Sequence, residues 1–82
     1  MTFDGALIRE GGVTFGIAVV RDAVLDSPRD CDSAIQQFSL ILRAPTVIMG
    51  DRSHRTYGRP DLVNFLRGVA LSQIPWQRYT IN

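Results

Sequence analysis

The chain has 82 residues, 45% of them hydrophobic and 21% charged, which is typical of one small globular domain spanning residues 1–82. Nine arginines, no lysine and eight acidic residues give a formal charge of +1. Because this charge supplies no field to attract DNA, RNA or anionic lipid, we expect neither a nucleic-acid nor a membrane partner. A chain of this length hides only about 60% of its unfolded surface on folding, so a partner chain would stabilise it.

The sequence predicts a cytoplasmic protein. Cys31 is the single cysteine, which excludes an internal disulfide and a dithiol redox pair within one chain. The first residues lack the basic start and apolar run of a secretion signal, and no stretch approaches the ~20 apolar residues that span a bilayer. We therefore expect a reducing compartment.

Two strands are predicted at residues 6–10 and 13–20, joined by a tight turn at Gly11 and Gly12. Consecutive glycines readily adopt the positive φ angles of a type I′ hairpin turn. That turn sets Ile8 opposite Phe15 and Leu7 opposite Gly16, because side chains alternate between the faces of a strand. One face is then bulky and the other nearly flat. The bulky face carries Phe15, Ile17 and Val19, and the flat face carries Leu7, Thr14, Gly16 and Ala18.

A helix is predicted from Pro28 to Leu42. Ser27 suits the N-cap, proline suits the first helical position, and Pro45 ends the helix by restricting the residue before it. A short apolar run is ambiguous between helix and strand, so a strand at residues 38–42 is the alternative. The buried stripe of the helix would be Cys31, Ala34, Ile35, Phe38, Ile41 and Leu42.

The remaining elements complete the order β-β-α-β-α-β. Residues 46–49 are β-branched and apolar, as in a central strand covered on both faces. Residues 50–59 are polar and form a loop, with a short strand at Thr56-Tyr57 as an alternative for part of it. Pro60 opens a second helix, and the tail at residues 76–81 is an edge strand. The predicted fold is a two-layer α/β sandwich: a mixed four-stranded sheet with two helices mainly on the bulky face. Its predicted core is Phe15, Ile35, Phe38, Val47, Leu62, Phe65 and Leu66.

The stretch from residue 13 to 69 resembles the second half of a thioredoxin-like fold. The matching parts are the strand at 13–20, the helix at 28–42, the step Ala44-Pro45-Thr46 into a strand, the glycine-bounded turn at 50–58 and the helix at 60–67. The CxxC motif of that family is absent, and so is the β-α unit that would carry it. The resemblance therefore implies no activity and no site residue, only a candidate cis bond at Ala44-Pro45.

The one local cluster suited to a ligand is the arginine-rich loop. Guanidinium groups bind phosphate and carboxylate in a bidentate way, and the loop runs into the N-terminus of a helix. We expect a small anion or phosphate ligand there; the alternative is an exposed turn whose arginines pair with Asp51 and Asp61. The candidate ligand-binding residues are Arg52, His54, Arg55, Tyr57 and Arg59.

Known catalytic and cofactor motifs are absent from the sequence, so we expect no catalytic residue, no metal and no cofactor. The leading hypothesis is a non-catalytic interaction domain that forms a homodimer or docks on a larger partner. It would use the flat sheet face or the C-terminal edge. The candidate interface residues are Leu7, Thr14, Gly16, Ala18, Trp76 and Tyr79. The second hypothesis is a small enzyme or anion-binding module with its site at residues 51–59.

Overall fold

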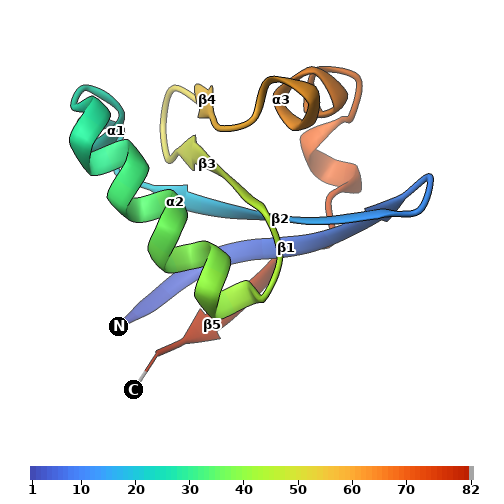
Figure 1. Ribbon diagram of the computed structural model, residues 1–82, viewed down its shortest axis with the longest axis horizontal. Coiled ribbons are helices and arrows are strands. Elements are labelled where there is room, and N and C mark those ends of the chain that lie inside the picture. The colour runs from blue at the N-terminus through green and yellow to red at the C-terminus, as the bar shows by residue number, and fades with distance from the viewer. Residues whose placement is uncertain (82) are drawn as a thin grey trace.

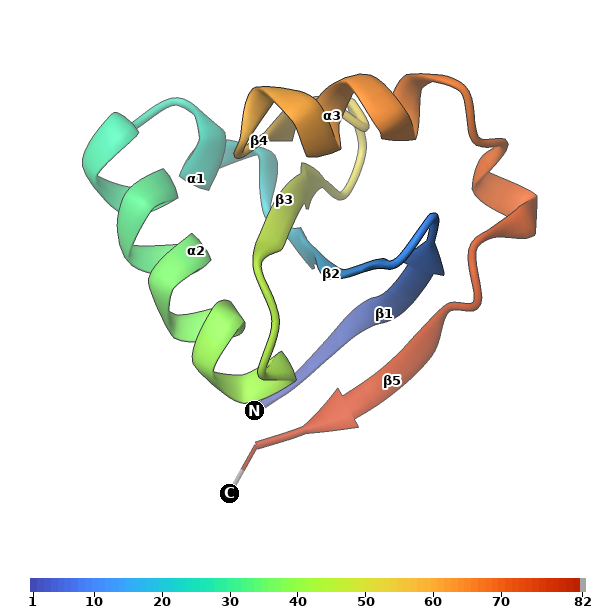
Figure 2. The ribbon, with the colours of Figure 1, turned by 45° about the vertical axis from the view of Figure 1, so that its right-hand side comes forward.

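The computed structural model describes residues 1–81, in which a five-stranded mixed sheet lies between helices on its two faces (Figures 1 and 2). The sheet order is β4-β3-β2-β1-β5, and every neighbouring pair is antiparallel except β2 and β3, which are parallel. The strands are β1 (Thr2–Glu10), β2 (Val13–Val20), β3 (Thr46–Gly50), β4 (Thr56–Tyr57) and β5 (Gln77–Thr80). The helices are α1 (Asp22–Leu25), α2 (Pro28–Leu42), α3 (Pro60–Arg67) and the 3-10 turn η1 (Leu71–Gln73).

The predicted hairpin between β1 and β2 is confirmed. Gly11 and Gly12 have φ angles of 55° and 81°, the left-handed values that a type I′ turn requires. The register is also as predicted, with Ile8 opposite Phe15 and Leu7 opposite Gly16. The turn chemistry therefore fixes which residues of β2 face each layer of helices.

Helix α2 begins and ends where its capping residues predict. The Ser27 hydroxyl accepts a hydrogen bond from the Asp30 backbone N–H at 3.3 Å, and Pro28 occupies the first turn. The helix ends at Arg43, which has a left-handed φ of 57°. Residues 38–42 belong to this helix, so the strand alternative is wrong.

The prediction that both helices pack on the bulky face is wrong. Helix α2 covers the flat face, where it contacts Ala18 and Ile48, whereas α3 covers the bulky face with Phe15 and Ile17. The reason is close approach: a Cβ at Gly16 would lie 2.6 Å from Leu42 Cδ1. Small residues on β2 thus make room for a helix, and the architecture has three layers instead of two.

Two apolar clusters consequently stabilise the sheet, one on each face. In the α3 cluster the Phe15 and Phe65 rings meet edge to face with centroids 5.7 Å apart, and in the α2 cluster Phe3 lies 4.6 Å from Phe38. Five of the seven predicted core residues are buried, whereas Ile35 and Phe65 are half-buried. The α3 cluster contains Ala6, Phe15, Ile17, Val47, Met49, Leu62, Leu66 and Ile74; the α2 cluster contains Phe3, Ala18, Cys31, Phe38, Leu42 and Ile48.

Several further features of the chain differ from the predicted fold. The sheet has five strands instead of four, because the alternative of a short strand at Thr56-Tyr57 is correct: these residues pair with Met49 and Ile48 to form β4. The short helix α1 was not predicted at all. The Ala44-Pro45 bond is trans, and the detailed thioredoxin-like topology is not confirmed.

The prediction of an edge strand at the end of the chain is confirmed: β5 pairs with β1 alone, antiparallel, and forms one edge of the sheet. The two ends of the described chain lie close together, because Met1 and Ile81 exchange backbone hydrogen bonds of 3.0 and 2.7 Å (Figure 1).

Among residues 1–81, no helix has the length and apolar character needed to cross a membrane.

Removal of the Phe38 ring should destabilise the fold more than removal of a neighbouring side chain of the same helix. Phe38 is 6% exposed and Leu40 is 77% exposed. We expect Phe38→Ala to lower the free energy of unfolding by about 3–5 kcal/mol. Leu40→Ala should change it by less than about 0.5 kcal/mol. Denaturant unfolding measures both, and equal midpoints for Phe38→Ala and the parent would contradict the packing of α2.

Candidate functional site

The polar turns that follow β2 and β3 lie side by side at one end of the sheet. The two strands are parallel, and Val20 pairs with Gly50 at their carboxyl ends. Arg21 and Asp22 follow β2, and residues 51–54 follow β3. Ligands often bind at the carboxyl ends of parallel strands in α/β proteins, so this end of the sheet is a candidate site.

Asp22 and Asp51 connect these two turns through hydrogen bonds. The Asp22 carboxylate accepts from the Ser53 hydroxyl at 2.9 Å and from the Ser53 backbone N–H at 3.1 Å. In return, Asp51 Oδ1 accepts from the Asp22 backbone N–H at 3.2 Å. Burial alone would raise the pKa of Asp22, but the bonds from Ser53, the backbone N–H of Arg52 and the charge of Arg55 together lower it. Asp22 is therefore ionised and holds the loop after β3 against the end of β2. We call the hydrogen bonds between Asp22, Asp51 and Ser53 the Asp22 clamp.

Gly50 leaves the space that this carboxylate occupies. A Cβ at Gly50 would overlap the Asp22 carboxylate and approach Ser53 Oγ to 2.8 Å and Leu25 Cδ1 to 2.9 Å. Neither Asp22 nor Gly50 was selected from the sequence as a site residue. In the sequence, each of these residues comes just after a predicted strand, which was the one indication of a site. That the two strands are parallel neighbours and end side by side depends on the tertiary fold.

The arginine-rich loop does not bring its guanidinium groups to one point. Arg55 bonds to Asp26 at 3.3 Å and Arg59 to Asp61 at 2.8 Å, both on the surface. Arg52 instead borders a small hollow with Arg21, Asp22 and Asp51. With two of its three guanidinium groups paired with carboxylates, the loop has fewer free donors for an anion than its composition indicates. Anion binding there stays a prediction.

His54 and Tyr57 point to different surroundings. The Tyr57 hydroxyl donates to Asp32 at 3.5 Å, and the negative charge of Asp32 is the main cause of a raised pKa of Tyr57. His54 has a left-handed φ of 58° and lines a cleft on the α3 side of the sheet, which shares Asp51 with the hollow beside Arg52 but does not include Arg52. The five predicted ligand-binding residues thus contact several different groups.

The predicted interface residues also separate into groups. Gly16 and Ala18 are buried beneath α2, so the expectation of an uncovered flat face is wrong for them. Leu7 and Thr14 are exposed. The remaining two, Trp76 and Tyr79, belong to the C-terminal segment. Trp76 is half-buried, and its indole N–H donates to the Leu71 carbonyl at 3.0 Å. The Tyr79 ring stacks on the Phe3 ring with centroids 5.1 Å apart.

Strand β5 presents backbone groups that no neighbouring strand uses. Met1 and Ile81 exchange two hydrogen bonds, so the pairs Phe3–Tyr79 and Gly5–Gln77 are the other hydrogen-bonded pairs of this antiparallel ladder. The N–H and C=O groups of Arg78 and Thr80 must therefore point away from β1. They form a free edge on which another strand can pair.

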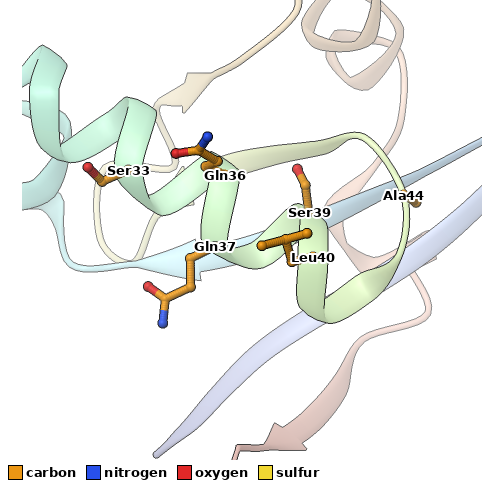
Figure 3. A pocket seen from close by; sticks show the side chains of 6 residues that line it. All are labelled: Ser33, Gln36, Gln37, Ser39, Leu40 and Ala44. Atoms are coloured by element: carbon orange, nitrogen blue, oxygen red, sulfur yellow. The ribbon is translucent and has the colours of Figure 1, made fainter.

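The outer surface of α2 is a second exposed feature. A shallow depression of about 630 Å³ runs along it, and Figure 3 shows its uncharged lining. Leu40 is 77% exposed at this surface. The lining residues are Ser33, Gln36, Gln37, Ser39, Leu40 and Ala44.

The ionisable side chains give no separate chemical centre. Within the described part of the chain, no group of three or more His, Cys, Asp or Glu side chains gathers at a metal-binding distance. Cys31 is buried and its thiol donates to the Val24 carbonyl at 3.4 Å. Burial, followed by the charges of Asp32 and Asp30, raises the pKa of the Cys31 thiol, which disfavours the reactive thiolate.

No protein-family model matches the chain, and comparison with curated proteins and with solved structures gave no significant match.

Gly50→Ala tests the close contact beneath the Asp22 carboxylate. We expect it to lower the free energy of unfolding by about 1–3 kcal/mol, because an added methyl group displaces Asp22 or Leu25. Gly68→Ala is the matched control: its Cβ would meet only the Phe65 carbonyl at 3.6 Å, and alanine there should be neutral or stabilise by up to about 1 kcal/mol. If both variants unfolded at the parent's midpoint, the Asp22 clamp would not be present.

Asp22→Asn tests the charge of the clamp. The folded-state pKa of Asp22 is lowered, so its contribution to stability is present above the unfolded value of about 3.9 and is lost as pH falls through the folded pKa. We expect the variant to melt below the parent at neutral pH, with a difference that shrinks at acid pH. Thermal melts across this range measure the effect, and a difference independent of pH would contradict it.

Proposed function

We propose that this protein is a small non-catalytic interaction domain that forms a homodimer by joining the β5 edges of two copies into one continuous sheet. The observation that carries the proposal is the free edge formed by the Arg78 and Thr80 backbone. The opposite edge of the sheet suits pairing less well, because β4 has two residues and is followed closely by Pro60.

The β5 edge is complementary to itself. In an antiparallel pair centred on Tyr79, Arg78 of one copy lies opposite Thr80 of the second copy. Each such pair exchanges two backbone hydrogen bonds, giving four across the two-fold axis. No like charges are directly opposed, and Arg78 is already paired with Asp4 of its own chain at 3.1 Å. The two Tyr79 rings lie on the same face at the centre of the pair.

Apolar surface beside this edge adds a reason for association. Helix α2 covers the sheet over β2 and β3 and reaches Phe3, but it leaves side chains of β1 and the C-terminal segment partly open on the same face. Met1 is 66% exposed and Leu7 40% exposed, and Tyr79 and Ile81 are half-buried. A second copy beside β5 would remove part of this surface from water, which favours the dimer.

Sedimentation of the parent and of Thr80→Pro tests the proposal. Proline at residue 80 removes an N–H that points away from β1, so the pairing of β5 with β1 is retained while the dimer loses two of its four hydrogen bonds. Because the interface is small, we expect the parent to be dimeric only at a concentration of roughly 100 µM or above. We expect the variant to be monomeric at the same concentration.

Thr80→Ala is the matched control, because it shortens the same side chain and keeps the N–H; it should remain dimeric. Circular dichroism checks that all three proteins are folded. A monomeric parent at this concentration, or a Thr80→Pro dimer as stable as the parent's, would rule out the β5 edge.

A further inference from the structure

A cleft of about 420 Å³ opens on the α3 side of the sheet, at the carboxyl ends of β2 and β3. It is separate from the β5 backbone edge and from the flat face. Its size is within the range of pockets that hold small organic molecules. The lining consists of Asp4, Val19, Met49, Gly50, Asp51, His54, Leu71 and Trp76.

The walls of the cleft combine apolar side chains with negative charge. Val19, Met49 and Leu71 supply the apolar part, and no arginine belongs to the lining. Within residues 1–81 the ion pairs are Arg55–Asp26, Arg59–Asp61 and Arg78–Asp4, so Asp51 has no basic partner. Asp4 is half-exposed and shares one carboxylate oxygen with Arg78. The lining itself therefore carries two carboxylates and no guanidinium group, while Arg21 and Arg52 border the adjoining hollow that shares Asp51.

Two aromatic residues border the same space. The Trp76 indole N–H donates a hydrogen bond to the Leu71 carbonyl, and both residues belong to the lining of the cleft. Tryptophan is the aromatic side chain that attracts cations most strongly. His54, together with Met49 and Leu71, also borders an adjoining cavity of about 240 Å³. The rest of its lining is Thr56, Val63, Leu66, Arg67 and Val69. Apart from Arg67 and Thr56, that cavity extends the apolar surface away from Asp4 and Asp51.

We infer that this cleft binds a small organic cation, an ammonium or guanidinium group carried on an apolar body. The positive group would lie near Asp51, Asp4 and the Trp76 indole, and the body would contact Met49 and Leu71. Charge attraction in a partly enclosed space and apolar burial favour the same ligand class. The inference does not depend on the homodimer, because Thr80 and the β5 backbone edge are not part of the lining.

The test uses 2-phenylethylammonium as the probe, with 2-phenylethanol and 3-phenylpropionate as uncharged and anionic analogues. Trp76 is the single tryptophan, so its fluorescence and its indole N–H resonance report on the cleft directly. We expect saturable binding of the ammonium probe at millimolar or lower concentration, about tenfold tighter than the alcohol, and weakest binding of the anion. The amide shifts should centre on residues 49–54 and 71–76.

The double variant Asp4→Asn/Asp51→Asn should lose the preference for the ammonium probe over the alcohol. Asp61→Asn is the control, since Asp61 is an exposed aspartate with an arginine partner outside the cleft, and it should keep the preference. Equal binding of ammonium and alcohol by the parent, no binding at about 10 mM probe, or equal loss in Asp61→Asn would each overturn the inference. The Thr80→Pro variant should bind as the parent does, which separates this result from the outcome for the dimer.

Discussion

The parallel pairing of β2 with β3 is the constraint on which the rest of the structure depends. Parallel neighbours require a crossover, so the chain between Val20 and Thr46 must pass over one face of the sheet, and α2 makes that passage. All five residues of β3 are buried, and burial of both faces of a strand requires a layer on each side. Helix α3 supplies the second layer. The three-layer architecture follows from this one pair of strands.

Local features of the fold were predictable because local chemistry determines them. Two glycines fix the hairpin register, Ser27 and Pro28 start α2, and the apolar run after Pro45 predicts a central strand. The placement of α2 was not predictable in this way. The flat face of β2 looks like uncovered surface in the sequence, yet Gly16 and Ala18 are small because Leu42 and its helix lie against them. A small residue on a strand indicates open surface or close packing, and only the partner element distinguishes these.

In the candidate sites, too, local sequence predicts some features and tertiary structure alone determines the others. The density of arginines in residues 51–59 predicts an anion site, and the alternative of local ion pairs holds for Arg59 with Asp61, two residues away. The partner of Arg55 is Asp26, whose approach depends on tertiary structure. Asp22 and Asp51 do not form a sequence motif. They meet because β2 and β3 end together, and the acidic cleft beside them depends equally on how η1 returns Trp76 to the sheet. The edge at β5, in contrast, was predictable from the alternating tail of the chain.

The β5 edge as a self-pairing surface is the central functional claim, and amide hydrogen exchange at several protein concentrations tests it most directly. The Tyr79 N–H bonds to β1 within the chain and should be protected at every concentration. The Arg78 and Thr80 N–H groups point outward, so their protection should rise with concentration as copies pair. Rapid exchange at Arg78 and Thr80 that stayed the same from the lowest to the highest concentration, with Tyr79 protected throughout, would contradict the claim.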